Sequence, residues 1–398
     1  MGMRITLKKD EMAQLLVMLY ILLRFISMFI PPYHFVILLY VMVGLLPVAL
    51  VADFRLRADN RFLLSVGAFL LSGLLCAVFQ HSGYTRIILE LPMIVVGICI
   101  AKYGLKLSYL YVLYYTSMVI VLFRMIINNL DSNAVFYHGS RNMITAWLIM
   151  ITCLLYLEYA RSKKIVPIYP AVITTAVCFI SGGRSGVVAS VFLTAMLLLY
   201  NIRFTSKHPL RILGVVIAGI AGLSVAIRRY YSVFFEGVIN RFKGIGYAER
   251  VWYENERLEY ITDYLTKMVN SLKNFLLGVP AEEMPILNTL NGELHNSYLA
   301  LHKHFGIIGF LIIAVFIFRV LKVKIKKKNA VFIIVTLTLL IRMFFETIAF
   351  TSFYDFVIFA LAYIPYVEEK ERVKDRIWVN YTEIKRHNNV PVHYGGAK

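Results

Sequence analysis

The sequence predicts an all-α integral membrane protein with about twelve transmembrane helices. Hydrophobic residues make up 59% of the 398-residue chain and charged residues only 16%, and the mean hydropathy is +0.70. Soluble domains typically have roughly 25% charged residues. The apolar residues also gather in long runs, and about 20 such residues are needed to cross about 30 Å of hydrocarbon.

Each predicted transmembrane helix is an apolar run bounded by polar residues. The first contains Arg24 and has no small-residue cleavage site, so we expect a retained helix rather than a removed signal peptide. We expect residues 1–398 to form a single polytopic membrane domain. The twelve segments are 13–30, 34–52, 62–79, 85–101, 105–127, 143–160, 165–181, 186–201, 210–227, 295–318, 329–349 and 351–367.

The distribution of lysine and arginine predicts the orientation. Most of the 42 basic residues fall in alternate connections, such as the "RVLKVKIKKK" run at 319–328. Short cytoplasmic loops carry the basic excess in membrane proteins. We therefore expect both termini inside, including a cytoplasmic tail at 368–398. The net charge of +19 then reflects topology and attraction to anionic headgroups, and nucleic acid is not expected as a partner.

One connection is long, 228–294, and the predicted topology places it on the outer side of the membrane. Its acidic and basic residues are nearly balanced, so we expect it to fold. Within it, apolar residues at helical spacing predict an amphipathic helix that Gly278 can end. This helix either packs on the bundle or lies in the membrane interface. The apolar positions are Leu258, Ile261, Leu265, Met268, Leu272 and Phe275.

Cysteine and histidine give no metal or cofactor pattern. All four cysteines lie inside predicted spans, so they are expected to be small apolar packing residues. No HExxH arrangement, GxGxxG or P-loop occurs. We expect no metal and no cofactor.

Charged residues inside the predicted spans indicate an outward-opening polar cavity. Such charges are costly in a membrane and usually face a protein-lined or wet interior. All of these fall in the outer halves of their helices. Alternatively, Arg342 and Glu346 form a structural pair, because their i,i+4 spacing brings them together on one helix face. The full set is Arg24, Glu90, Arg124, Arg342, Glu346 and Asp355.

The stretch "SGGRSGVVAS" at 181–190 places Arg184 in a tight outer turn between two predicted spans. Gly182, Gly183 and Gly186 leave the backbone amides accessible. Accessible amides beside a guanidinium group form a plausible anion site. The alternative is that Arg184 only anchors the helix end at the membrane interface.

Three separated elements resemble the O-antigen polymerase and O-antigen ligase superfamily, which are integral membrane glycosyltransferases of the GT-C type. In order, they are "SGGRSG", then "RLEYITDYLTKMVNSLKNFLLGVP" at 257–280, then "HNSYLALHKHFGIIGF" opening the next span. The likeness covers about half of the chain closely and the rest only in hydropathy. It implies a multi-pass protein of the bacterial inner membrane with its active site facing the periplasm.

The resemblance also implies the donor and the residues that bind it. The donor would be an oligosaccharide on undecaprenyl pyrophosphate, used without a metal. Arg184 would match the first family arginine, and Arg257 the arginine of the long loop, with Arg250 and Arg241 as alternatives. Two convergent guanidinium groups would neutralise the pyrophosphate as it leaves.

His295 matches the family histidine, which would accept the proton of the acceptor hydroxyl or orient that hydroxyl. Judged by its position alone, a histidine at a helix start is more often a cap or an interfacial residue. Asn296 and Glu293 are the neighbours that could orient it.

Polymerase and ligase share these elements and differ in the acceptor. The acceptor is another lipid-linked repeat unit for the polymerase and the sugar of the lipid A core for the ligase. We favour the polymerase, because the aromatic content of 14% suits stacking on sugars and no outer basic patch is present for a phosphorylated core. A chain-length regulator is then a candidate partner, beside membrane lipids. A lipid-linked oligosaccharide flippase is the third alternative, although the sequence has no evident internal repeat.

Overall fold

The computed structural model describes residues 9–31, 34–51, 60–137, 140–162, 166–205, 247–284, 294–350 and 353–369. Within these ranges the chain is helical and contains no strand. Two short 3₁₀ turns lie at Ser132–Ala134 and Ala281–Glu283. The α-helices are α1 (Lys9–Ser27), α2 (His34–Val51), α3 (Asn60–Phe79), α4 (Tyr84–Tyr103), α5 (Leu107–Ile127), α6 (Arg141–Ser162), α7 (Tyr169–Ser181), α8 (Arg184–Thr205), α11 (Tyr247–Asn270), α12 (Leu272–Leu277), α14 (Ser297–Lys326), α15 (Ala330–Phe345) and a last helix at 355–369.

Six of the described helices are long and apolar enough to cross a membrane: α3, α4, α5, α6, α8 and α14. Shorter apolar stretches occur in α2, α7 and α15. These helices are consistent with a helical membrane protein. The ninth predicted segment, 210–227, lies outside the described residues, and the number twelve stays a prediction.

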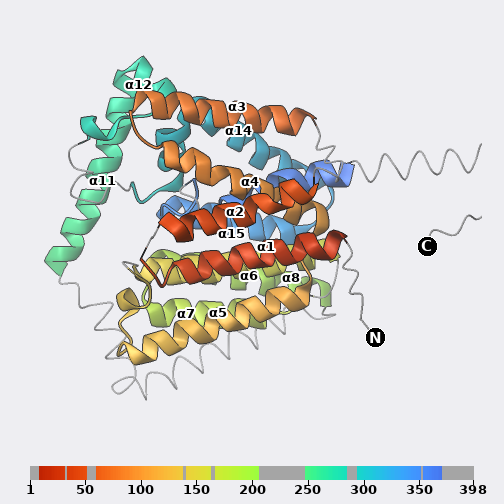
Figure 1. The fold of residues 1–398 in the computed structure, drawn as a ribbon. Helices are drawn as coiled ribbons and strands as arrows, with labels where there is room; N and C mark the ends of the chain where they lie inside the picture. The colour runs from red at the N-terminus through yellow and green to blue at the C-terminus, as the bar shows by residue number, and fades with distance from the viewer. Residues whose placement is uncertain are drawn as a thin grey trace, which may run out of the picture.

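The long helices lie side by side and run roughly along one direction (Figure 1). Helix α11 crosses one end of this bundle, at the left of Figure 1, and α12 sits at the same end beside α3. The turns between α3 and α4, between α5 and α6, and between α7 and α8 lie at this end too. We call it the α11 end.

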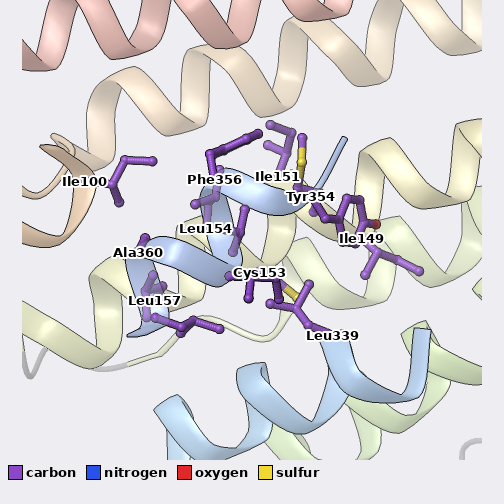
Figure 2. Close-up of a cluster of buried hydrophobic side chains, with 14 of the residues drawn as sticks. Ile100, Ile149, Ile151, Cys153, Leu154, Leu157, Leu339, Tyr354, Phe356 and Ala360 are labelled. Atoms are coloured by element: carbon purple, nitrogen blue, oxygen red, sulfur yellow. The ribbon is translucent and has the colours of Figure 1, made fainter. Parts of the chain in front are cut away.

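Helix α6 forms the centre of the bundle. In its apolar window 89% of the residues are buried, whereas the other five long helices reach at most 56%. The last helix packs against it, and Phe356 and Ala360 lie among Cys153, Leu154 and Leu157 of α6 (Figure 2). All four cysteines are buried free thiols, which confirms their prediction as packing residues.

The predicted amphipathic helix is present but is divided in two. Helix α11 ends at Asn270, and Ser271 starts α12 by accepting a hydrogen bond from the Asn274 amide at 3.3 Å. Gly278 ends α12 at a φ of 79°, as the sequence predicts. The side chain of Leu272 is 75% exposed, because the segment docks mainly through two tyrosines that the apolar spacing did not indicate.

These two tyrosines, Tyr260 and Tyr264, are fully buried. The Tyr264 hydroxyl lies 2.8 Å from His302 Nδ1, and His302 Nε2 donates to the Phe275 carbonyl at 2.8 Å. Burial raises the pKa of the Tyr264 phenol well above its ordinary value, so Tyr264 remains a donor. His302 therefore joins α14 to both α11 and α12.

Helix α14 is broken at Gly306, whose φ of 60° lies in the left-handed region. A β-carbon there would run into the Leu276 carbonyl of α12. Glycine at this position permits both the break and the close approach of α12. The break separates the first turns of α14, which directly follow His295 and Asn296, from the longer apolar part.

Candidate functional site

A cluster of polar side chains lies at the α11 end, where α6, α8, α14 and α15 meet. It is made of His295, Glu346, Arg342, Asn142 and Ser185, and we call it the His295 cluster. Its members come from four segments of the sequence, and hydrogen bonds connect them.

His295 stands immediately before α14, held by a carboxylate. Its Nδ1 lies 3.0 Å from Glu346 Oε1. The residue has a φ of 44°, which is a strained conformation for a residue that carries a side chain. The side chain is 21% exposed. With Nδ1–H donated to the carboxylate, Nε2 carries the lone pair of the ring and can act as a base.

Both the side chain and the backbone carbonyl of Glu346 accept hydrogen bonds. Its Oε2 accepts from Asn142 Nδ2 at 3.0 Å, and its backbone carbonyl accepts from the Ser297 hydroxyl at 2.7 Å. The Ser297 oxygen in turn accepts from the Ile348 and Ala349 amides at 2.9 and 3.1 Å. The carboxylate that orients His295 is thus itself immobilised by neighbouring helices.

Arg342 is a fully buried cation. Its Nη1 donates to Ser185 Oγ at 2.8 Å, and its Nη2 donates to the Asn142 carbonyl at 3.0 Å and to Thr145 Oγ1 at 3.2 Å. Glu346 Oε2 lies 3.9 Å from Nη1. The predicted Arg342–Glu346 pair therefore exists, but it is one contact in a larger network that also includes His295.

The "SGGRSG" turn joins this network through Ser185. Gly182 ends α7 in the left-handed conformation, with a φ of 71°, and α8 begins at Arg184. Gly186 is packed so closely on Thr145 that a β-carbon would collide with it. Close packing against α6, rather than exposed amides, thus explains this glycine, which corrects the interpretation of Gly186 from the sequence. Arg184 is exposed at the start of α8, one residue from the cluster member Ser185.

The loop arginines are placed by their backbone. Arg250 and Arg257 both lie in α11, and their side chains, like Arg241, fall outside the described part. Tyr260, one helical turn after Arg257, has its ring centroid 6.4 Å from that of His295. Helix α11 therefore brings the Arg257 position close to the cluster, whereas Arg250 lies about two turns further along the helix.

The two residues predicted to orient His295 are placed differently. The Asn296 side chain caps α14 by accepting from the Tyr298 and Leu299 amides at 2.9 and 3.1 Å, and it donates to the Phe344 carbonyl at 3.0 Å. These hydrogen bonds occupy the Asn296 side chain, and Glu346 is the residue that contacts the His295 ring. Glu293 lies outside the described residues.

The other charged residues of the predicted cavity lie outside this cluster, and the buried carboxyl groups of Glu90 and Asp355 interact with each other. Arg24 lies over the Tyr40 ring at 4.6 Å, and Arg124 over the Phe29 ring at 5.8 Å. Asp355 is buried and accepts from the Phe353 amide at 3.1 Å. Only Arg342 and Glu346 of that set belong to the His295 cluster. In the part of the chain described, no three His, Cys, Asp or Glu side chains are arranged to hold a metal ion.

Chemically, the cluster offers an oriented base near one guanidinium group, that of Arg342. Such a set can accept a proton at His295 Nε2 while positive charge stabilises an anionic group nearby. Comparison with known proteins gives no further assignment, because no known family matches the chain and no curated protein is significantly similar to it.

Proposed function

We propose that the protein is a membrane glycosyltransferase of the O-antigen polymerase type, which joins lipid-linked repeat units at the periplasmic face. The donor is an oligosaccharide on undecaprenyl pyrophosphate. The observation that carries the proposal is the 3.0 Å contact between His295 Nδ1 and Glu346, which leaves Nε2 as a base at the end of the bundle that α11 covers. The resemblance of the three sequence elements supports the same activity.

In the proposed reaction, the acceptor hydroxyl gives its proton to His295 Nε2 while its oxygen attacks the anomeric carbon of the donor. The bond from that carbon to the pyrophosphate oxygen breaks, and the electron pair leaves with the pyrophosphate. Arg184 and Arg257 neutralise the charge on this leaving group. Glu346 stabilises the imidazolium that forms, as a carboxylate does beside a catalytic histidine.

The positions of their helices support the roles proposed for the two arginines. Arg184 starts α8, beside Ser185, which is hydrogen-bonded to Arg342. Arg257 lies on α11 one turn before Tyr260, the ring next to His295. Both positions thus border the cluster. Arg257 lies on the loop helix α11, and Arg184 lies on the bundle helix α8. This arrangement supports Arg257 rather than Arg250 as the second donor-binding residue, and Arg241 lies outside the described residues.

Deleting the gene and separating the lipopolysaccharide on a gel tests the proposal. A polymerase defect leaves lipid A core carrying one repeat unit, and wild-type protein restores the ladder whereas His295→Ala does not. Bare core with accumulated lipid-linked polymer would instead identify a ligase. Bare core without outward-facing intermediates would identify a flippase, and an unchanged ladder would remove the protein from this pathway.

A further inference from the structure

A small polar pocket of about 10 Å³ lies between the α3–α4 turn and the first turns of α14. Its polar side chains are those of Gln80, Ser82, Arg86 and His304. Ser82 is exposed, so the pocket reaches the surface of the bundle. The volume has room for about one water-sized group. The pocket can therefore take a single polar atom of a larger ligand, and none of its residues belongs to the His295 cluster.

Arg86 and His304 supply hydrogen-bond donors to this pocket. Arg86 Nη1 donates to His304 Nε2, because a guanidinium group is always protonated. The His304 proton then lies on Nδ1, which makes no hydrogen bond to another of the described residues. Gln80 fixes the arrangement, since its Nε2 donates to the Lys303 carbonyl at 2.6 Å and to the Leu277 carbonyl at 3.0 Å. A ligand with acceptor atoms fits such a lining.

Positive charge gathers around the same pocket. The Lys303 side chain is only 6% exposed, and its ammonium group interacts electrostatically with Arg86 and with His304. Glu90 also interacts with Arg86, but this carboxyl group is buried one turn further along α4 and does not line the pocket. Two cations held this close repel each other, and an anion between them offsets the repulsion.

The start of α4 adds backbone donors. Helix α4 begins at Tyr84, and its N-cap is Gly83, which has a φ of 87° and provides no side-chain cap. The first amides of a helix have no partner within the helix and carry partial positive charge, so they favour phosphate groups. A β-carbon on Gly83 would meet nothing within 4 Å. The space over this helix start, which borders the pocket, is therefore open.

Apolar surface continues from the pocket along two membrane helices. Helices α3, α4 and α14 are all long and apolar enough to cross a membrane. One turn after Ile87 and His304, on the same helix faces, Leu91 is 40% exposed and Ile308 is 50% exposed. A charged pocket with hydrocarbon contacts beside it matches the headgroup and acyl chain of a membrane lipid. Free phosphate would use only the charged part.

We propose that Arg86, Lys303 and His304, with the start of α4, bind the phosphate group of an anionic phospholipid. One phosphate oxygen enters the pocket, and the acyl chains lie on the apolar surface of α4 and α14. The bound headgroup joins α4 to the first turns of α14, the segment that directly follows His295. The site does not rest on the proposed function, because neither its residues nor its ligand takes part in sugar transfer.

Thermal unfolding of the purified protein in detergent tests the site, because a ligand that binds the folded state raises Tm with its concentration. Dihexanoyl phosphatidylglycerol should raise Tm. Dihexanoyl phosphatidylcholine should do so much less, since its own cation offsets the phosphate charge. Arg86→Gln should weaken phosphatidylglycerol binding about tenfold, the effect of losing a hydrogen bond to a charged group. Arg124→Gln is the matched control, because Arg124 is also half-buried and lies over Phe29, outside the pocket.

Arg86→Lys keeps the charge but loses the planar fork, so it should bind phosphatidylglycerol with intermediate affinity. This variant, together with Lys303→Met, keeps the test decisive if Arg86→Gln does not fold. Sodium phosphate, compared with sodium chloride at equal ionic strength, separates the two sources of phosphate. Stabilisation by sodium phosphate as strong as that by phosphatidylglycerol would overturn the lipid as the ligand. Equal stabilisation of wild type and the Arg86 and Lys303 variants by phosphatidylglycerol would overturn the site.

Discussion

At the residue scale, the sequence located His295 but not the side chain that orients it. His295 was found by its place in the "HNSY" stretch, and its neighbours Asn296 and Glu293 were the natural candidates to orient it. The orienting carboxylate is Glu346, 51 positions away. Glu346 was noticed only as a possible i,i+4 partner of Arg342. No local pattern shows that the starts of α6, α8 and α14 meet the end of α15, so the sequence does not indicate Asn142 and Ser185 either.

Asn296 provides a test of whether Glu346, rather than Asn296, orients His295. Asn296→Ala removes the cap of α14, which should lower the free energy of unfolding by about 1 kcal/mol. Sugar transfer by the folded protein should persist, because His295 is held by Glu346. Thermal unfolding in detergent and a transfer assay measure the two effects, and Asn296→Asp, which can still cap, is the matched control. An Asn296→Ala protein of normal stability without activity would restore Asn296 to the site.

At the element scale, hydropathy predicted the helices well, because burial in lipid requires long uninterrupted apolar runs. Each predicted span other than 210–227 overlaps a described helix. The breaks were harder to predict. The division at Ser271 and the bend at Gly306 arise from the docking of α12 on α14, a tertiary contact that the apolar periodicity of either segment does not contain.

The same contact explains why the apolar spacing of α11 was only partly informative. The spacing indicated a face that includes Leu265 and Leu272, yet both side chains are exposed. Tyr260 and Tyr264 dock the helix instead, since their rings pack while the Tyr264 hydroxyl meets His302. A tyrosine can thus anchor a loop helix through a polar tip as well as an apolar ring.

Gly306 tests the α12–α14 contact. Gly306→Ala should destabilise the protein by about 1–3 kcal/mol, because alanine is strained at positive φ and its β-carbon meets the Leu276 carbonyl. Gly67 is the matched control, since it is exposed in α3 with nothing within 4 Å of a built β-carbon. Thermal unfolding of the two alanine variants decides between them. Equal stability of both would mean that α12 does not pack on α14 as described.

At the scale of the whole molecule, the account requires that all parts of the candidate site lie on one side of the membrane. The turns of α3–α4 and α7–α8, helix α11 and the start of α14 share the α11 end of the bundle (Figure 1). The opposite end of the bundle then carries the basic connections that are predicted to be cytoplasmic. The connection between α14 and α15 is one of them. A single orientation thus satisfies both the charge distribution and the position of the His295 cluster.

Two exposed serines test this sidedness. Ser82 lies in the turn before α4 at the α11 end, and Ser162 is the last residue of α6. In intact cells, an impermeant thiol reagent should label Ser82→Cys, and it should label Ser162→Cys only after the membrane is permeabilised. The four native cysteines are buried and should give little background. Labelling in the reverse order would place the His295 cluster in the cytoplasm.

The most direct measurement of the central claim is chain extension by purified protein supplied with an undecaprenyl pyrophosphate glycan. A positioned base contributes typically about 10²–10⁴-fold to such a step, so His295→Ala should extend chains slower by that factor while it still binds the donor. Glu346→Gln should be impaired in the same direction, because a neutral amide stabilises the imidazolium less than a carboxylate does. Wild-type rates of chain extension by His295→Ala would contradict the account.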